Sequence, residues 1–217
     1  MQMILLRFTD RGWCLQNQIN TLQKFCTLSG MQVNASKTQI IVFRNGGIVK
    51  SNEKWFLNAQ ELEVVPYYKY LGLFFSSRLN WSYATKCLSV QSNKALYMIR
   101  MLQNKCHNLP PEVLFEIFDT VVAPTVTYAS EIWGYKIYNS IENVQLKFCR
   151  QLLGLGSNTP NVAVLGECGR FPLFVTYYTK CVKYWLKLVT METGELPKSA
   201  YKMALVLCEA GKNNWSR

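Results

Sequence analysis

Three lysines in the C-terminal third of the chain have a spacing that could bind phosphate groups. Lys180, Lys183 and Lys187 fall on one face of a predicted helix, with Tyr177 and Tyr184 beside them. Lysines over backbone phosphates with neighbouring aromatic rings are typical of single-strand or duplex nucleic-acid binding. A solvated face is the more economical interpretation, because an apolar stripe recurs on the opposite side of the same helix. That stripe consists of Phe174, Tyr178, Cys181, Trp185 and Leu188.

The sequence offers few candidate residues for hydrolytic catalysis or metal binding. The eight cysteines include no C-x-x-C pair, and His107 is the only histidine. This spacing fits neither a zinc site nor a disulfide scaffold, so reduced and mostly buried thiols are favoured. The serines and cysteines lack a partnered base, and the sequence has no glycine-rich phosphate loop.

Two segments in the N-terminal part could place cations near a phosphate chain. Val33-Asn34 and Ser36 give turn chemistry just before an apolar strand predicted over residues 39–43, and Lys37 lies between the turn and the strand. Taken alone, Lys37 is an ordinary surface lysine. The second segment, residues 68–75, has the aromatic and aliphatic content of a buried strand.

The elements that must position these residues change type near residues 76–80. Before this point we expect one amphipathic helix, ending near Gly30, and several short strands. The predicted strands are residues 4–8, 39–43, 62–65 and 68–75, with a hairpin turn at Asn45-Gly46-Gly47.

From Trp81 onward the apolar residues recur at helical spacing. The first helix of this part is long and carries Lys86, Asn93 and Arg100 on a stripe of their own. Later helices are predicted at residues 111–122, 125–135 and 141–152, after Pro160, after Pro172 and at 199–210, with a break at Ala123-Pro124 and an end at Gly154. The sequence therefore predicts an α+β fold, in which a helix with hairpins precedes an all-α part.

The charge balance favours an anionic partner. Lys and Arg number 24 against 13 Asp and Glu, which gives a net charge of +11 and a pI near 9.3. Nucleic acid or another anionic surface is the natural class of partner for such a chain. The apolar stretches are interrupted by lysines, and no basic leader with a cleavage site precedes them, so we expect no membrane span and no secretory signal. An intracellular protein, nuclear or cytoplasmic, is the expectation.

Several of these segments together resemble the reverse transcriptases of LINE-like, non-LTR retrotransposons. Gly30-Met31-Gln32-Val33-Asn34-Ala35-Ser36-Lys37-Thr38, the strand after it and residues 68–75 resemble the last two palm motifs of that family. The helical region that follows is similar to the family's thumb. Further likenesses, in family order, are residues 128–134, 150–154 and 167–173. The resemblance implies a palm end at residues 1–78, a thumb-like region at 79–193, and a C-terminal helix and polar tail at 194–217.

The resemblance also implies an activity and roles for single residues. The intact family makes DNA on an RNA template, with Mg²⁺ and a nicked target DNA as primer. Lys37 would lie beside the incoming nucleotide, as general acid or charge partner for the departing pyrophosphate. Residues 68–75 would form the primer grip, in which Lys69, Tyr70, Leu71 and Gly72 contact the strand. Expected partners are therefore an RNA template, a DNA primer or target, and the missing N-terminal half of the polymerase.

The family's metal-binding turn does not occur in this sequence. In the family a Tyr/Phe-Ala-Asp-Asp turn precedes a short apolar strand, but here residues 4–6 follow only Met1-Gln2-Met3. Asp10 comes after the strand, where it suits a helix cap. We therefore expect no metal or cofactor in this chain, and a fragment that binds template and primer without polymerising. Two alternatives stay open: a non-enzymatic basic nucleic-acid-binding module, and a non-functional truncated product.

Overall fold

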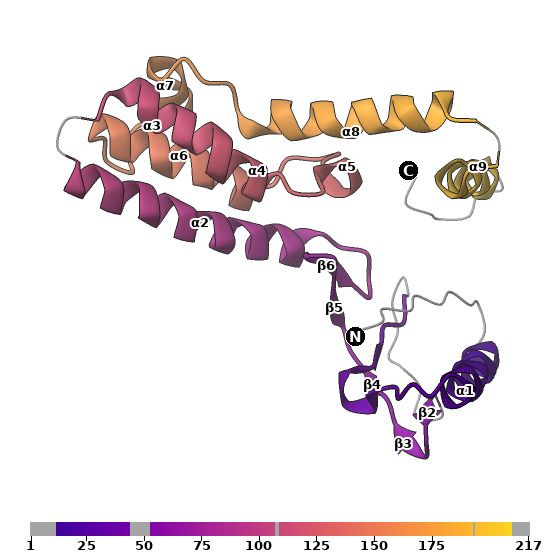
Figure 1. The fold of residues 1–217 in the computed structure, drawn as a ribbon. Coiled ribbons are helices and arrows are strands. Elements are labelled where there is room, and N and C mark those ends of the chain that lie inside the picture. Colours follow the sequence, from indigo (N-terminus) through magenta and orange to yellow (C-terminus); the bar gives the residue numbers. More distant parts are fainter. Residues whose placement is uncertain (1–11, 44–52, 107–108, 193, 210–217) are drawn as a thin grey trace. The chain divides into compact units, whose positions relative to one another are not determined.

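The computed structural model of the chain describes residues 12–43, 53–106, 109–192 and 194–209 (Figure 1). Its fold is mixed α+β, as the sequence predicted, with every described strand before residue 77. The chain divides into two compact units, residues 1–84 and residues 85–217. Some predicted features lie outside the described residues: the strand at 4–8, Asp10, the turn at 45–47, His107, and the C-terminal tail with Trp215.

The core of the first unit forms between one helix and short strands. Helix α1 (Gly12–Leu28) packs Leu15 and Ile19 against a buried cluster of Ile40, Trp55, Leu57 and Leu62. Strand β1 (Gln39–Ile40) pairs in parallel with β4 (Glu63–Val64).

The strand predicted over residues 39–43 is therefore shorter than expected. The last backbone bond beside this ladder runs from Val65 N to Ile40 O, at 2.8 Å. The next residue is Pro66, whose carbonyl oxygen accepts a hydrogen bond from Ser77 N at 2.9 Å. From Tyr67 onward the chain pairs with residues 73–76 and no longer with β1, so the β1–β4 ladder ends here.

This unit also contains a hairpin over residues 56–61 that was not predicted. Strand β2 (Phe56–Leu57) pairs antiparallel with β3 (Gln60–Glu61) through a turn in which Asn58 and Ala59 have φ of 49° and 63°. The Gln16 side chain of α1 donates to Phe56 O and accepts from Phe56 N, both at 2.9 Å. The Gln16 amide therefore satisfies both backbone groups of Phe56, as a neighbouring strand would.

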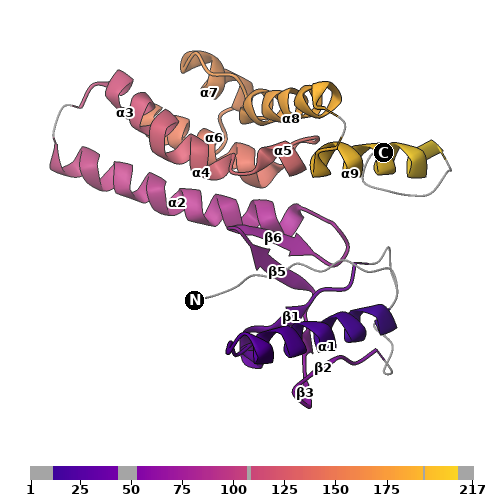
Figure 2. The same ribbon diagram turned by 45° about the vertical axis from the view of Figure 1, so that its right-hand side comes forward.

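The aromatic segment after Pro66 is a hairpin, as the resemblance of residues 68–75 to a primer grip, itself a hairpin, implied. The single strand that the apolar pattern predicted over these residues is wrong. Strand β5 (Tyr67–Tyr70) pairs antiparallel with β6 (Leu73–Ser76) (Figure 2). Leu71 and Gly72 have φ of 46° and 88° and reverse the chain between them. Two consecutive residues with positive φ give the tight turn whose twist matches that of the flanking strands.

The described part of the second unit consists of helices. Most of α2 (Ser82–Lys105) belongs to it. The helix buries Leu88 and Ile99, as the periodicity predicted, and also Leu96, whereas Leu102, which has the same spacing, is 37% exposed. Asn80 caps this helix, since its Oδ1 accepts a hydrogen bond from Ser82 N at 2.8 Å.

The break predicted at Ala123-Pro124 is wrong, because a wider helical turn carries the chain past the proline. Helix α3 (Pro111–Ile117) continues into the π-helical segment η2 (Phe118–Val122) and then α4 (Ala123–Val126). Ala123 N donates to Phe118 O, five residues back. A proline in a regular helix clashes with the carbonyl four residues before it, and the π turn removes that clash.

The remaining helices follow the sequence more closely. The helix predicted at 125–135 is divided by a turn in which Ala129 has a φ of 52°, so α5 is only Ser130–Trp133. Helix α6 (Asn139–Leu153) ends at Gly154 as predicted, with a φ of 65° at that glycine. The others are α7 (Asn161–Glu167), α8 (Leu173–Thr190) and α9 (Leu196–Glu209), the last beginning three residues earlier than predicted.

Aromatic side chains fill the core of the second unit. Trp133, Tyr177 and Phe118 are fully buried, and the Trp133 and Tyr177 rings lie 5.2 Å apart. Tyr138 N donates to the Tyr177 hydroxyl at 3.3 Å, which joins the start of α6 to α8. Among the described residues, none of the helices combines the length and the apolar character that crossing a membrane requires.

Candidate nucleic-acid interface

Lys37 lies at the end of a short turn that the Asn34 side chain holds together. The 3₁₀ segment η1 (Ala35–Lys37) begins after Asn34, whose Oδ1 accepts from Ser36 Oγ at 2.6 Å and from Lys37 N at 3.2 Å. Thr38 Oγ1 donates to Asn34 O at 2.8 Å. Asn34 and Thr38, which carry part of the family resemblance, thus serve the backbone of the turn. The Lys37 side chain is exposed, so its ammonium is available to a phosphate group.

The β5–β6 hairpin combines an exposed cation with aromatic rings. Lys69 Nζ lies 5.7 Å from the centre of the Phe74 ring, and the Phe74 ring meets the Tyr83 ring edge-on at 5.2 Å. Tyr67 stacks on Tyr83 at 4.3 Å and remains 44% exposed. Aromatic faces beside a cation are suited to stacked bases and strand phosphates.

The tip of this hairpin is conformationally costly. Leu71 has positive φ and is 66% exposed, although a side chain with a Cβ in that region costs about 1 kcal/mol. Gly72, the next residue, adopts its φ of 88° without that cost. An exposed apolar side chain on a strained turn is a suitable contact point for a bound strand. Tyr70 is half-buried and packs edge-on against Phe75 at 6.3 Å, so it also supports the hairpin.

The structure does not bring Lys37 and the hairpin tip together. Because β1 and β4 are parallel, Lys37, which precedes β1, lies at the end of the ladder where β4 begins. The hairpin follows the other end, after Pro66. A ligand that contacts both places must therefore extend along the ladder.

The three lysines of α8 have different environments. Lys180 is half-buried, and its Nζ donates to Thr127 Oγ1 at 2.8 Å. Tyr177, predicted beside the lysines as an accessible ring, is fully buried. Lys183 and Lys187 are exposed and remain available to a ligand.

The apolar stripe predicted for the buried side of α8 is only partly right. Leu188 is buried as predicted, but Tyr178 and Trp185 are 44% and 48% exposed. The other buried residues of this helix are Leu173 and Tyr177. Both sets recur at helical spacing, so periodicity alone could not choose between them. The contact with Trp133 determines which face of α8 is buried, because the Trp133 ring packs on Tyr177.

Exposed basic side chains of α2 and α6 form a strip across the two helices. It consists of Lys86, Asn93 and Arg100 of α2 and Lys147 of α6, which we call the α2–α6 strip. Lys147 Nζ donates to Asn93 Oδ1 at 3.4 Å, and the three cationic side chains are exposed. Helix α2 contains four lysine or arginine residues and no aspartate or glutamate.

The sequence pattern indicated the three α2 residues of this strip but not Lys147. The seven-residue spacing of Lys86, Asn93 and Arg100 was visible, but nothing linked it to a ligand. Lys147 is 54 residues from Asn93 in sequence, so only the packing of α6 along α2 shows that they are neighbours. The absence of aspartate and glutamate from α2 was the one sequence feature that could have indicated a basic surface on this helix.

The described carboxylates do not form a site for magnesium ions. No three His, Cys, Asp or Glu side chains come together as a metal site in the part of the chain that the structure describes. Asp119 is paired with Arg170, Glu61 with Lys54 at 3.1 Å, and Glu63 accepts from Gln39. These residues do not fit the pair of ions that the family uses, and we derive no step through metal.

In comparisons with protein-family models, with curated proteins and with solved structures, nothing matches this chain. The function must therefore be argued from the residues and their geometry.

Proposed function

We propose that this chain is the nucleic-acid-binding end of a LINE-like reverse transcriptase, comprising the last part of the palm and a thumb-like helical region. The ordered set of family-like segments in the sequence supports the relationship. The α2–α6 strip is the single observation that carries the binding function, because it is exposed, cationic and built on two packed helices.

The dimensions of the strip suit a nucleic-acid backbone. Lys86 and Arg100 are separated by fourteen residues of helix, which is about 21 Å at 1.5 Å per residue. Duplex DNA carries roughly one charge per 1.7 Å of axis, so about twelve phosphate charges lie within that length. The strip therefore meets phosphates without reading bases, as expected of a protein that must move along its substrate.

In this proposal the first unit supplies the contacts near the growing strand. Lys37 offers a cation on a rigid turn, and Lys69, Tyr70, Leu71 and Gly72 offer a hairpin with stacking rings. The ligands are an RNA template with its DNA primer or target. The chain contains no Asp-Asp turn, so the proposal concerns binding and not polymerisation by the chain alone.

Fluorescence anisotropy with labelled probes of about 20 nucleotides tests the proposal. An RNA–DNA hybrid, a DNA duplex and a single strand are each titrated with the purified chain from 50 to 300 mM NaCl. We expect hybrid binding that weakens steeply with salt. A matched pair of variants removes two charges each from α2: Lys86→Gln with Arg100→Gln in the strip, and Lys94→Gln with Lys105→Gln on a different face.

The strip variant should lower the log–log salt slope by about 1.8 and the affinity at 0.15 M salt about 30-fold, since each duplex phosphate contact contributes about 0.9 to the slope. The control variant has the same net charge and should change both values little. Equal effects of the two variants, or no binding by the unmodified chain, would contradict the proposal. A preference for the hybrid favours the polymerase fragment, and equal binding of all probes favours a general nucleic-acid-binding module.

A further inference from the structure

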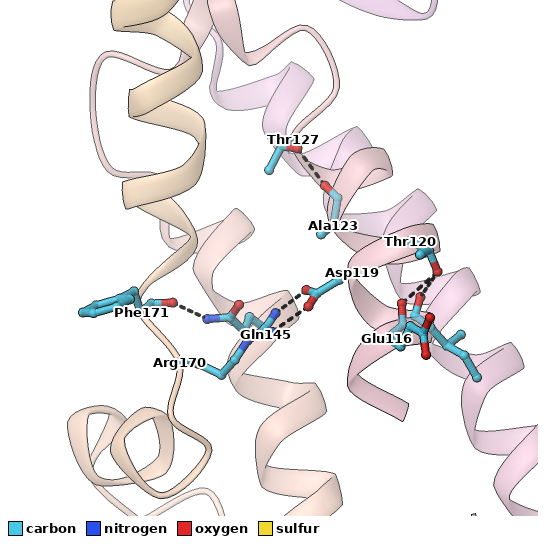
Figure 3. Close-up of polar contacts among 9 residues, drawn as sticks. Glu116, Asp119, Thr120, Ala123, Thr127, Gln145, Arg170 and Phe171 are labelled. Carbon is cyan, nitrogen blue, oxygen red and sulfur yellow. Dashed lines mark hydrogen bonds and ion pairs between the residues drawn. The ribbon is translucent and has the colours of Figure 1, made fainter. Parts of the chain in front are cut away.

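Helix α7 and the segments on either side of it are hydrogen-bonded to α6 at several points. Gln145 Nε2 of α6 donates to Phe171 O at 2.8 Å (Figure 3). Arg150, further along α6, donates to Thr159 O at 3.0 Å and to Asn161 Oδ1 at the start of α7. Helix α7 and the turn after it are therefore held against α6 from both ends.

Two cysteines face each other within this contact. Cys149 lies on α6, one turn after Gln145, and is fully buried. Cys168 directly follows α7, is half-buried, and lies beside Cys149, so that the two thiols interact electrostatically. The turn that carries Cys168 is closed by a bond from Arg170 N to Leu165 O at 2.9 Å.

We propose that Cys149 and Cys168 form a reversible disulfide when the protein meets a peroxide. This goes beyond nucleic-acid binding and assigns a modification site to two residues that the proposed function does not use. Paired thiols on two packed elements need only a small shift of side chains to reach S–S bonding distance. In a reducing compartment such a pair is a transient redox site and not a structural cross-link.

The chemistry balances with hydrogen peroxide as oxidant. The more accessible Cys168 sulfur attacks one peroxide oxygen, the O–O bond breaks, and water and a Cys168 sulfenic acid result. The Cys149 sulfur then attacks the sulfenic sulfur, an S–S bond forms, the S–OH bond breaks, and the Cys149 proton leaves with that hydroxyl as a second water. Two thiols and one peroxide thus give one disulfide and two waters.

The surroundings of the pair affect the rate of the second step. Burial, followed by the neighbouring Cys168 thiol, raises the pKa of Cys149 to about 12, while Arg170 and Arg150 oppose that shift. Cys149 is therefore protonated at neutral pH, and disulfide formation should be faster at pH 9 than at pH 7.

Peptide mapping of the full chain after peroxide treatment tests the proposal. Trypsin cleaves after Lys147, Arg150 and Arg170, which places Cys149 and Cys168 in different peptides. We expect those two peptides to be joined after treatment, an intact mass lower by about 2 Da for two lost hydrogens, and full reversal by dithiothreitol. Cys168→Ser should abolish the joined peptide, and Cys106→Ser, at an exposed site elsewhere, should leave it unchanged.

The unmodified chain also gives an answer that does not depend on a variant folding. Iodoacetamide should label Cys168 in the reduced protein and fail to label it after peroxide. Sulfinic acid at Cys168 beside an unchanged Cys149 thiol would overturn the proposal, as would a peroxide-treated chain joined only through other cysteines.

Discussion

Replacing Arg170 by methionine should destabilise the second unit about twice as much as replacing Asp119 by asparagine. Arg170 Nη1 donates to Asp119 Oδ2 at 2.8 Å, and its Nη2 pairs with the other carboxylate oxygen (Figure 3). The same guanidinium lies 5.3 Å from the Phe115 ring centre and 5.5 Å from that of Phe118. One side chain thus joins the turn after α7 to α3 and η2.

The size of each contribution follows from exposure. The Asp119 side chain is 49% exposed and that of Arg170 is 21% exposed, so solvent screens the ion pair and limits it to about 1 kcal/mol. The two ring contacts with a partly desolvated cation add about 1 kcal/mol. Arg170→Met keeps the apolar stem but loses both terms, about 2 kcal/mol, whereas Asp119→Asn loses only the first.

Thermal unfolding followed by far-UV circular dichroism measures this difference, because most of the described helix belongs to the second unit. Arg170→Met should lower the melting temperature by about 8 °C and Asp119→Asn by about 4 °C. In 1 M NaCl the cost of Asp119→Asn should shrink, while the ring-contact part of Arg170→Met should persist. Equal costs for the two variants would refute the contribution of Phe115 and Phe118.

Two further predictions concern a buried carboxyl and a strained turn. Glu142 Oε2 accepts a hydrogen bond from Leu173 N at 3.0 Å, but burial raises the pKa of Glu142 above its usual value of 4.5. The folded state therefore holds the proton of this carboxyl more tightly than the unfolded state does. The resulting contribution to the free energy of unfolding is complete below the unfolded pKa and is lost as pH rises through the folded pKa. The free energy of unfolding of the unmodified chain should therefore decline above about pH 4.5, and Glu142→Gln should remove that decline. Urea unfolding of both proteins across this pH range measures it, and two parallel curves of unfolding free energy against pH would contradict the prediction. Ala59→Gly should stabilise the β2–β3 hairpin by about 0.5 kcal/mol, because Ala59 has a φ of 63° and glycine adopts it without a Cβ clash; a lower urea midpoint by tryptophan fluorescence would show that reasoning to be wrong.

The sequence predicted those elements that local signals define. The apolar period of α2 and the glycine after α6 act within a few residues, and both elements were confirmed. The β2–β3 hairpin was missed because its turn, Asn58-Ala59, lacks the glycine that usually marks such turns. The break expected at Pro124 failed because a π turn is decided by packing and leaves no simple sequence signal.

The candidate site was predictable only where its residues are close in sequence. Asn34 was expected in a turn beside Lys37, and it caps that turn. By contrast, Lys180 was expected in solvent but donates to Thr127, which lies in the turn after α4. Which face of a helix becomes buried depends on contacts across the fold, and these are not encoded in the period of one helix.

The family-like segments of the second unit are used for packing. Trp133 Nε1 donates to Tyr128 O at 3.0 Å within the first of them. Arg150, in the second, holds Thr159, and Arg170, in the third, holds Asp119. The residues that carry the resemblance therefore serve packing in this chain, and ligand contacts must come from other side chains.

Variants of the packing residues and variants of the cationic surface should therefore have different effects, the former on stability and the latter on nucleic-acid binding. Arg170→Met removes a charge that is already paired with Asp119 within the fold, so it should lower stability while the salt slope of nucleic-acid binding stays nearly constant. The strip variant at Lys86 and Arg100 removes charges from exposed positions, so it should lower the slope while stability stays within about 0.5 kcal/mol. If Arg170→Met changed the slope as much as the strip variant does, Arg170 would contact phosphate, and its role could not be explained by Asp119 and the two rings.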